Sequence, residues 1–306
     1  MEKNTWRGGR TAGVIALTGS LLVAGTVFAA TVVTPSVTVG NAAPIVSAVA
    51  LNGGASMILT PNATTTVNVV ATITDNNGCA DINGGTTTVL LYRSGVTSST
   101  CFTTPNNANC YVATAFTASS TCATTNINTT TTFNIYYFAQ STDASSSYPV
   151  QNWIATVIFK DPSNATGSAD APGQEMATLT ALNVTTSSIN YGTLAASSTT
   201  GAANQTTTIT NVGNSSTTLN LSGTALSSGA TSIATSSQHY ATSSFTYGGS
   251  EQQLSQTPIG VPGFLLTAPT STSAVSGTLY WGAGIPAGTP LGTYNGTSTF
   301  TAIFSS

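Results

Sequence analysis

The sequence predicts an all-β protein of two antiparallel β-sandwiches in tandem, and three observations support this prediction. Short stretches of alternating apolar and polar residues recur along the chain, separated by turn residues roughly every 8 to 12 positions. No window of helical length carries an apolar stripe with the 3.6-residue period. Apolar residues make up 40% of the chain, which favours folded domains over a disordered chain.

Charged side chains are scarce. The 306 residues include five Lys plus Arg, eight Asp plus Glu and one His, a charged fraction of 4%, against roughly 25% in typical globular domains. Nucleic-acid binding needs a dense basic surface, so that class is excluded. The shortage of ionisable groups also argues against catalysis, and we expect no enzymatic activity and no catalytic residues.

The N-terminus predicts export. Its first ten residues hold three of the five basic side chains, Lys3, Arg7 and Arg10. An apolar stretch follows and ends in Val27-Phe28-Ala29, the small-x-small form of a cleavage site. We therefore expect residues 1–29 to be a signal peptide and the mature protein to be secreted or at the cell surface. An uncleaved membrane anchor is the alternative; no second apolar run of membrane length follows, so we expect no mature transmembrane segment.

We expect residues 30–43 to form an extended arm. Its sequence, TVVTPSVTVG and the residues around it, is rich in Val and Thr and has no charge. Such a segment can add as a strand to the sheet of another subunit. The alternatives are a flexible spacer and the first strand of the following domain.

The first sandwich is expected over residues 44–162. Its strand signals alternate with period two, as in TVNVVATITD, FNIYYFAQ and WIATVIF, and TVLLY is an apolar strand core. The Pro-, Gly- and Ser-rich residues 163–174 are expected to be a linker. The second sandwich is expected over residues 175–306, with strands in TTTITNV, TTLNLSGTAL, GFLLTA, VSGTLYW and GTYNGTSTFTAIF, and further ones in INYGTL and SFTYG.

Turn and strand patterns in the second half resemble a known group of proteins. The segments NVGNSSTTLNLSG and PAGTPLGTYNGTSTFTA are similar to the Ig-like repeats of bacterial and archaeal cell-surface proteins. The first half, with TDNNGCADING and LLYRSGV, looks similar to Ser/Thr-rich secreted surface proteins. The resemblance implies Ig-like sandwiches and work at the cell envelope.

All four cysteines lie in the first half, at Cys79, Cys101, Cys110 and Cys122. In an exported protein they predict two disulfides, with three pairings open. Cys101 and Cys110 bracket a Pro-Asn-Asn turn, which favours them as a local pair and leaves Cys79 with Cys122.

Residues 75–84, DNNGCADING, concentrate oxygen ligands in one loop. Asp75, Asn77 and Asp81 alternate as at the start of a calcium loop, but the helices and Glu of an EF-hand are absent. We expect Asp143 to lie at the same end of the sandwich, where it would complete a calcium site. The alternative, which the pattern favours, is turn chemistry with a disulfide corner.

Other candidate chemistry is sparse. We expect His239 to be a solvated loop or strand residue, Glu175 and Glu251 to be isolated, and Trp153 and Trp281 to be core residues. The expected function is a secreted structural or assembly protein of the cell surface, such as a filament, surface-layer or envelope component. Its partners would be other copies or other surface proteins. The alternative is an adhesin or a module that binds carbohydrate or protein, with a glycan as partner.

Overall fold

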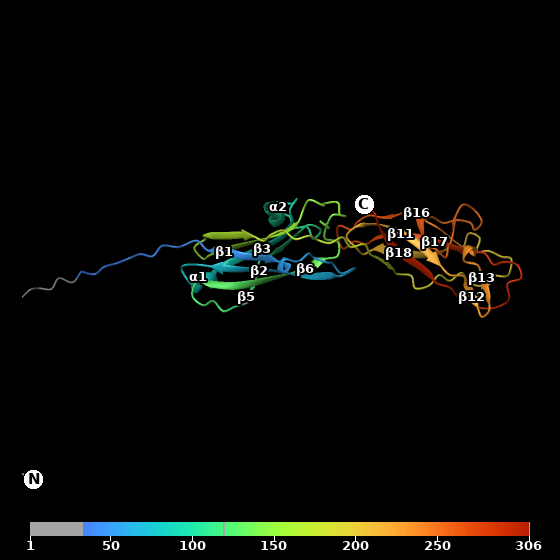
Figure 1. The fold of residues 1–306 in the computed structure, drawn as a ribbon, viewed down its shortest axis with the longest axis horizontal. Helices are drawn as coiled ribbons and strands as arrows, with labels where there is room; N and C mark the ends of the chain where they lie inside the picture. Colours follow the sequence, from blue (N-terminus) through green and yellow to red (C-terminus); the bar gives the residue numbers. More distant parts are fainter. Residues whose placement is uncertain (1–32, 119, 306) are drawn as a thin grey trace, which may run out of the picture. The chain divides into compact units, whose positions relative to one another are not determined.

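The computed structural model describes residues 33–118 and 120–305. The chain divides into two units, Met1–Gly40 and Asn41–Ser306. The expected signal peptide, residues 1–29, lies outside the described residues. Strands account for 43% of the described residues and helices for 7%, so the fold is all-β, as predicted, and these helices form no layer of their own (Figure 1).

Two four-stranded antiparallel sheets make up the first half of the unit that begins at Asn41. One sheet has the order β1-β2-β6-β5, with β1 Ile45–Leu51, β2 Thr64–Thr74, β6 Asn126–Tyr136 and β5 Thr117–Ala118. The other has the order β4-β3-β7-β8, with β4 Cys110–Ala113, β3 Thr86–Arg93, β7 Trp153–Lys160 and β8 Thr166–Asp170. The connections contain η1 (Asn52–Gly54), α1 (Cys79–Gly84) and α2 (Ser98–Thr103).

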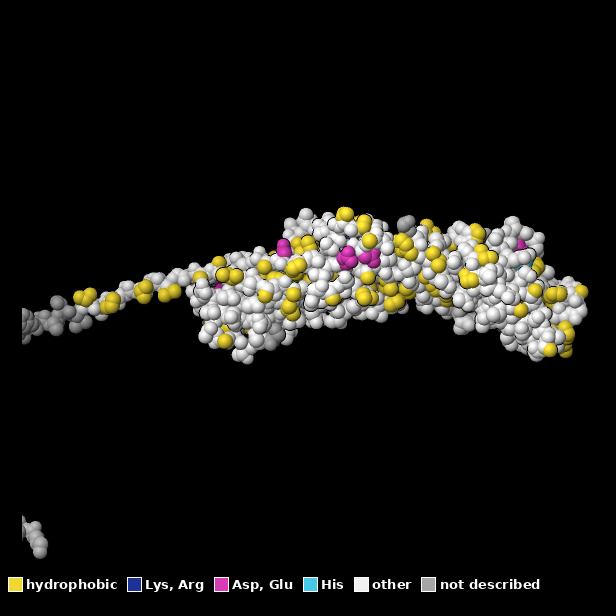
Figure 2. All heavy atoms as spheres, viewed as in Figure 1, with side chains coloured by type: hydrophobic (Ala, Val, Ile, Leu, Met, Phe, Trp, Pro, Cys, Tyr) yellow, Lys and Arg dark blue, Asp and Glu magenta, His cyan; other side chains and the backbone are white. Residues whose placement is uncertain are grey.

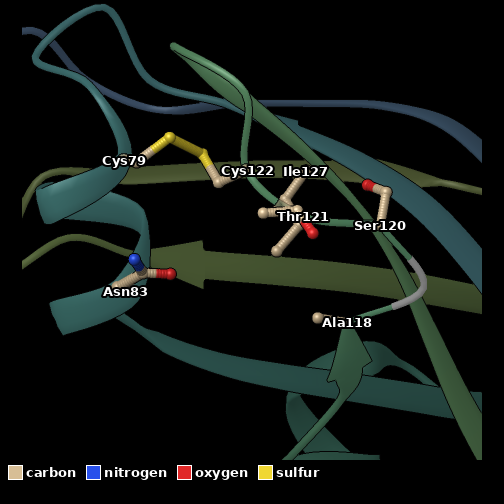
Figure 3. Close-up of a pocket in the computed structure, with 7 residues that line it drawn as sticks. All are labelled: Cys79, Asn83, Ala118, Ser120, Thr121, Cys122 and Ile127. Carbon is tan, nitrogen blue, oxygen red and sulfur yellow. A yellow bond between two sulfur atoms is a disulfide. The ribbon is translucent and has the colours of Figure 1, made fainter.

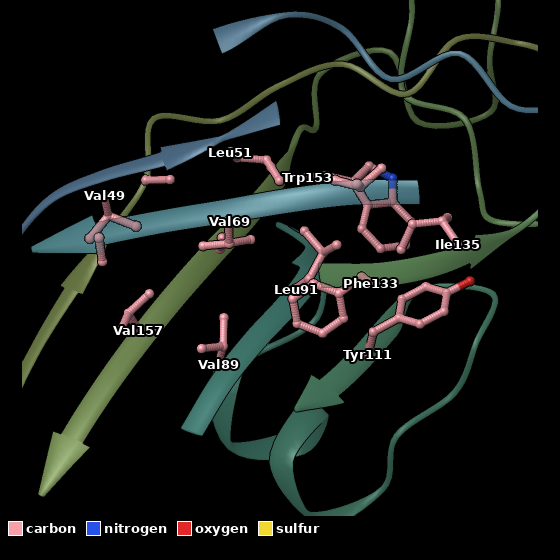
Figure 4. Packing of buried hydrophobic residues seen from close by; sticks show 14 of the residues in the cluster. Val49, Leu51, Val69, Val89, Leu91, Tyr111, Phe133, Ile135, Trp153 and Val157 are labelled. Carbon is pink, nitrogen blue, oxygen red and sulfur yellow. The ribbon is translucent and has the colours of Figure 1, made fainter. Parts of the chain in front are cut away.

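The apolar faces of these sheets pack on each other to form one core (Figure 4). Alternate residues of β2 are buried, from Val67 to Ile73, and so are alternate residues of β7 from Trp153 to Phe159. Trp153 is fully buried and its indole N–H donates to the Gln140 carbonyl at 2.8 Å, which satisfies the single polar atom of that side chain. The predicted period-two alternation therefore gives the core its residues.

The prediction that residues 163–174 are a linker is wrong, because Thr166–Asp170 form strand β8. Asp161 and Asn164 close a tight turn, in which the Asn164 N–H donates to the Asp161 carbonyl at 3.0 Å and Asn164 has a φ of 72°. Asn tolerates this left-handed conformation. Lys160 then pairs with Thr166. The turn-forming residues of this segment thus make a hairpin rather than a boundary.

The segment after β8 also remains attached to the first half. Met57 pairs with Met176 in a parallel bridge, and Met176 is fully buried in the first core. The Ala177 N–H donates to the Met57 carbonyl at 2.9 Å.

Two more sheets form the second half. The first has the order β15-β14-β17-β10-β9, with β15 Gln252–Gln253, β14 Gln238–Ala241, β17 Val275–Ala283, β10 Gln205–Asn211 and β9 Leu182–Val184. The second has the order β16-β11-β18, with β16 Ile259–Leu266, β11 Ser216–Gly223 and β18 Ser298–Ser305. A small hairpin joins β12 (Leu226–Ser228) to β13 (Thr231–Ile233), and η2 spans Thr235–Ser237.

The second core repeats the principle of the first. Trp281 and Leu279 from β17 pack with Leu219 and Leu221 from β11, and all four are buried. Two expected strands are absent, since residues 189–194 and 244–248 have no strand structure. Ile189 nevertheless packs against the core, so its apolar character reflects burial of an irregular segment.

Asn214 connects the two halves within this unit. Its side-chain amide N–H groups donate to the carbonyls of Ala139 (2.9 Å) and Ala177 (3.1 Å), and its side-chain oxygen accepts from the Leu179 N–H at 2.7 Å. The residue is 6% exposed, so these three bonds have little competition from water.

Replacing Asn214 by Ala should therefore leave three backbone groups without partners, one of them buried (Ala139) and two part-buried (Ala177 and Leu179). Each costs about 1–3 kcal/mol, and the loss falls on the connection rather than on either core. We expect calorimetry to show one unfolding transition for the wild type and two separated transitions for Asn214→Ala. Asn220→Ala, on a partly exposed strand position, serves as the control; two transitions in the wild type would contradict the coupling.

Candidate functional site at a carboxylate cluster

The loop between β2 and β3 is shaped by its Asp, Asn and Gly residues. Asp75 follows β2, and its Oδ1 accepts from the Asn77 N–H at 2.8 Å, which forms an Asx turn. Gly78 has φ 100° and ψ −176°, a conformation open to glycine alone. This turn directs the chain into α1, which carries Asp81 in its first turn.

Three carboxylates converge at this end of the first sheets. Asp75, Asp81 and Asp161 each place one oxygen within 4.8 Å of the other two. Asp75 is fully buried and Asp161 is 3% exposed, whereas Asp81 is half-buried. Asp161 reaches the cluster because it follows β7, whose last residue pairs with Thr86 at the start of β3.

The hydrogen bonds within and around the cluster leave one buried carboxylate oxygen without a partner. Asp161 accepts from the Asn41 side chain and from the Ala165 N–H, both at 2.8 Å. Asp75 Oδ2 is buried and has no hydrogen-bond partner. Buried carboxylate oxygens are normally paired, so this atom lacks its usual partner, which the described side chains do not supply.

No basic side chain compensates the cluster within the described part of the chain. The ion pair found there joins His239 to Glu251. Of the two basic residues after the N-terminal ten, Arg93 lies over the Tyr148 ring at the opposite end of β7 from Asp161. The other, Lys160, precedes Asp161 but makes no ion pair with these carboxylates. Carboxylates 4.8 Å apart repel by roughly 3 kcal/mol per pair at an effective dielectric constant of about 20. The arrangement can hold a cation, and its cost is otherwise unrelieved.

The structure changes the expected ligand set. Asp143 is not part of the cluster; its carboxylate accepts from the N–H of Thr178 (2.5 Å) and from its hydroxyl (2.7 Å). The register explains this correction. Thr74 pairs with Asn126 and Thr64 with Tyr136, so the residues after β6 leave from the end of the sheet opposite to Asp75.

Asn77 and Asp161 complete the comparison with the sequence. The Asn77 side-chain oxygen accepts from the Ala42 N–H at 2.6 Å, which ties the loop to the start of the compact unit. Asp161 was not among the expected ligands, because it follows a different strand and lies 80 positions after Asp81 in the sequence. If the strand that ends at Lys160 had been paired with the strand that follows residues 75–84, Asp161 would have been expected near Asp75. Calcium binding itself stays a prediction.

Both disulfides form, and they follow the favoured pairing: Cys79 bonds to Cys122 and Cys101 to Cys110. They indicate an oxidising, extracellular type of environment. The Cys79–Cys122 bridge borders an open hollow of about 530 Å³, lined also by Asn83, Ser120, Thr121 and apolar side chains (Figure 3). The labelled groups that line it are uncharged, so this hollow lacks the convergent ionisable groups of a catalytic site.

The two bridges should differ in their contribution to stability. Cys79–Cys122 closes a sequence separation of 43 and Cys101–Cys110 one of 9. By restricting the unfolded chain, the two bridges should stabilise the folded protein by about 4 and about 2.7 kcal/mol respectively. We expect the Cys79→Ser/Cys122→Ser protein to lose more unfolding free energy in denaturant titrations than Cys101→Ser/Cys110→Ser. An equal loss in both would contradict this account.

His239 and Glu251 contradict the expectations for them, since His239 is 9% exposed and paired. Its Nδ1 lies 2.8 Å from Glu251 Oε1, its Nε2 lies 3.1 Å from the Ser236 carbonyl, and its ring stacks on Tyr247. Burial acts to raise the pKa of Glu251, but hydrogen bonds from His239 and from the Gly248 N–H outweigh it and lower that pKa. The pair joins β14 to the loop before β15.

Acid should weaken the fold through Glu251. Because its pKa is lower in the folded than in the unfolded state, its contribution is present above the unfolded value of about 4.3 and is lost as the pH falls through the folded value. Glu251→Gln should cost about 1–3 kcal/mol of unfolding free energy at pH 7 and flatten the fall in melting temperature between about pH 5 and pH 3. Glu175→Gln is the control, and an unchanged acid profile for Glu251→Gln would refute the assignment.

Comparisons with known proteins identify no family. The sequence matches no protein-family profile and no curated protein. Among solved structures, red sea bream transglutaminase is 11% identical with a TM-score of 0.21; the match covers 83% of this chain and 28% of that one. Trypsin-activated alpha-2-macroglobulin from Escherichia coli is 14% identical with a TM-score of 0.22, and the match covers 78% and 18%. The chain thus spans less than a third of either protein, and similarity at this level assigns no function.

Proposed function

We propose that the protein is a secreted structural component of the cell surface that assembles through its N-terminal arm. The observation that carries this proposal is the apolar face of residues 33–40. Val33, Val37 and Val39 fall on one face of an extended chain, with Pro35 between the first two. They are 81–88% exposed and belong to a segment outside the unit that begins at Asn41. An extended segment with an apolar face suits strand addition, in which the backbone supplies hydrogen bonds and alternate side chains fill pockets.

Strand β18 offers the matching edge in a second copy of the chain. It pairs with β11 and is terminal in the order β16-β11-β18. Its eight residues, like the eight of the described arm, include no charge, and charge is a common device against edge pairing. Phe304 and Ile303 are 37% and 38% exposed, so an added strand would cover apolar surface.

The surface chemistry supports a structural rather than a catalytic role. On the face drawn in Figure 2, most side chains are uncharged and Asp and Glu side chains are few. Within the described residues, no helix is long and apolar enough to cross a membrane. The signal-like N-terminus, the two disulfides and the resemblance to Ig-like surface repeats all favour export.

Removing the arm tests this function. The deletion should span residues 30–39, because Asn41 donates to Asp161 and the Ala42 N–H donates to Asn77 in two different loops of the compact unit. We expect the wild type to form polymers in sedimentation and electron microscopy, and the deletion variant to be a monomer with unchanged melting. Val150→Ser, at an exposed apolar residue elsewhere, is the matched control and should assemble normally.

The acceptor edge has its own test. Ile303→Lys places a charge on the exposed face of β18, which should block polymer growth while the protein stays folded. If the deletion variant and Ile303→Lys assemble like the wild type, the proposal is wrong. A wild type that stays monomeric and is retained on a glycan array would instead identify an adhesin.

A further inference from the structure

We propose that Asp75, Asp81 and Asp161 bind one calcium ion at the end of the first pair of sheets. The cluster has two independent features that point to a cation. One oxygen of each carboxylate lies within 4.8 Å of the other two. Asp75 is fully buried, yet its Oδ2 has no hydrogen-bond partner among the described residues. The second feature shows that the Asp75 side chain is not simply a solvated acid or a turn former, since turn formation uses its other oxygen.

The donor set favours calcium over other metals. The three side chains supply oxygen, while the nearby Cys79 is held in a disulfide and His239 pairs with Glu251 in the second half. Carboxylate oxygens select hard cations rather than zinc or copper. Calcium binds oxygens at about 2.3–2.6 Å, so two ligands on opposite sides of the ion are roughly 4.6–5.2 Å apart. Magnesium requires about 2.0–2.1 Å and a near-ideal octahedron, to which three carboxylates from separate segments are less suited.

The ion would join the loop after β2 to a turn that is distant in the sequence. Asp75 follows β2, Asp81 lies in α1 and Asp161 begins the turn between β7 and β8. Asp161 also accepts the side-chain N–H of Asn41, the first residue of the compact unit. Calcium would thereby hold α1 against both sheets and fix the point at which the chain enters the fold. Cation binding does not depend on the proposed assembly function.

The test compares melting and binding with and without calcium. After removal of metals with EDTA and dialysis, the full protein is titrated with CaCl2 by calorimetry, and its melting temperature is measured in 1 mM CaCl2 and in EDTA. We expect one ion per chain and a melting temperature several degrees higher in calcium, because a ligand that binds only the folded state stabilises it.

Asp81→Asn separates a metal site from a structural turn. It removes one of the repelling charges, so the metal-free variant should melt at or above the metal-free wild type, yet its calcium affinity should fall at least tenfold and its calcium-dependent shift should disappear. Asp161→Asn should lose the shift in the same way and serves as a second variant if Asp81→Asn does not fold. Asp143→Asn, which lies outside the cluster, should keep the full calcium response.

Three results would overturn the proposal. The first is a wild type whose melting temperature and calorimetric trace do not respond to CaCl2. The second is a calcium response that survives Asp81→Asn and Asp161→Asn. The third is a response to MgCl2 at the same concentration that equals or exceeds the response to CaCl2.

Discussion

The eleven-residue ladder between β2 and β6 determines from which end of their sheet the loops next to these two strands leave. Antiparallel pairing from Thr64↔Tyr136 to Thr74↔Asn126 places the ends of this ladder roughly 34 Å apart, at about 3.4 Å per residue. Side chains of loops that leave from the same end can contact one another, and side chains of loops at opposite ends cannot. This register sends the residues after β6 away from Asp75, so Asp143 binds Thr178 instead. Asp161 reaches Asp75 through the other sheet, where the last residue of β7 pairs with the first residue of β3.

The alternation of apolar and polar residues along the strands explains which parts of the fold the sequence could predict. Period-two patterns around Val67, Trp153 and Leu219 identify strands because one face of each sheet must be buried, and these residues are core residues in the structure. The two disulfides were also predictable, since an even number of cysteines in an exported chain rarely stays reduced. These features depend on local pattern and composition alone.

Other features depend on pairing between distant residues, which local patterns do not specify. The segment after Lys160 has linker composition, yet Pro162 and Asn164 form a tight turn because Thr166–Asp170 has a partner strand. His239 looked like a solvated residue because Glu251, twelve positions away, becomes its partner only through the β14–β15 pairing. The carboxylate cluster was half predicted for the same reason: Asp75 and Asp81 are neighbours in sequence, whereas Asp161 comes from another sheet.

The Cys79–Cys122 bridge has a consequence for proteolysis. It encloses β3, α2, β4 and β5 in one covalent loop, and Cys101–Cys110 lies inside that loop. A protease that cuts the backbone once between Cys79 and Cys122 therefore cannot release a fragment, because the two pieces remain joined through sulfur. Damage of this kind would leave the strands of both sheets at high local concentration, so a nicked molecule would keep its fold and its place in a larger structure until the disulfide is reduced.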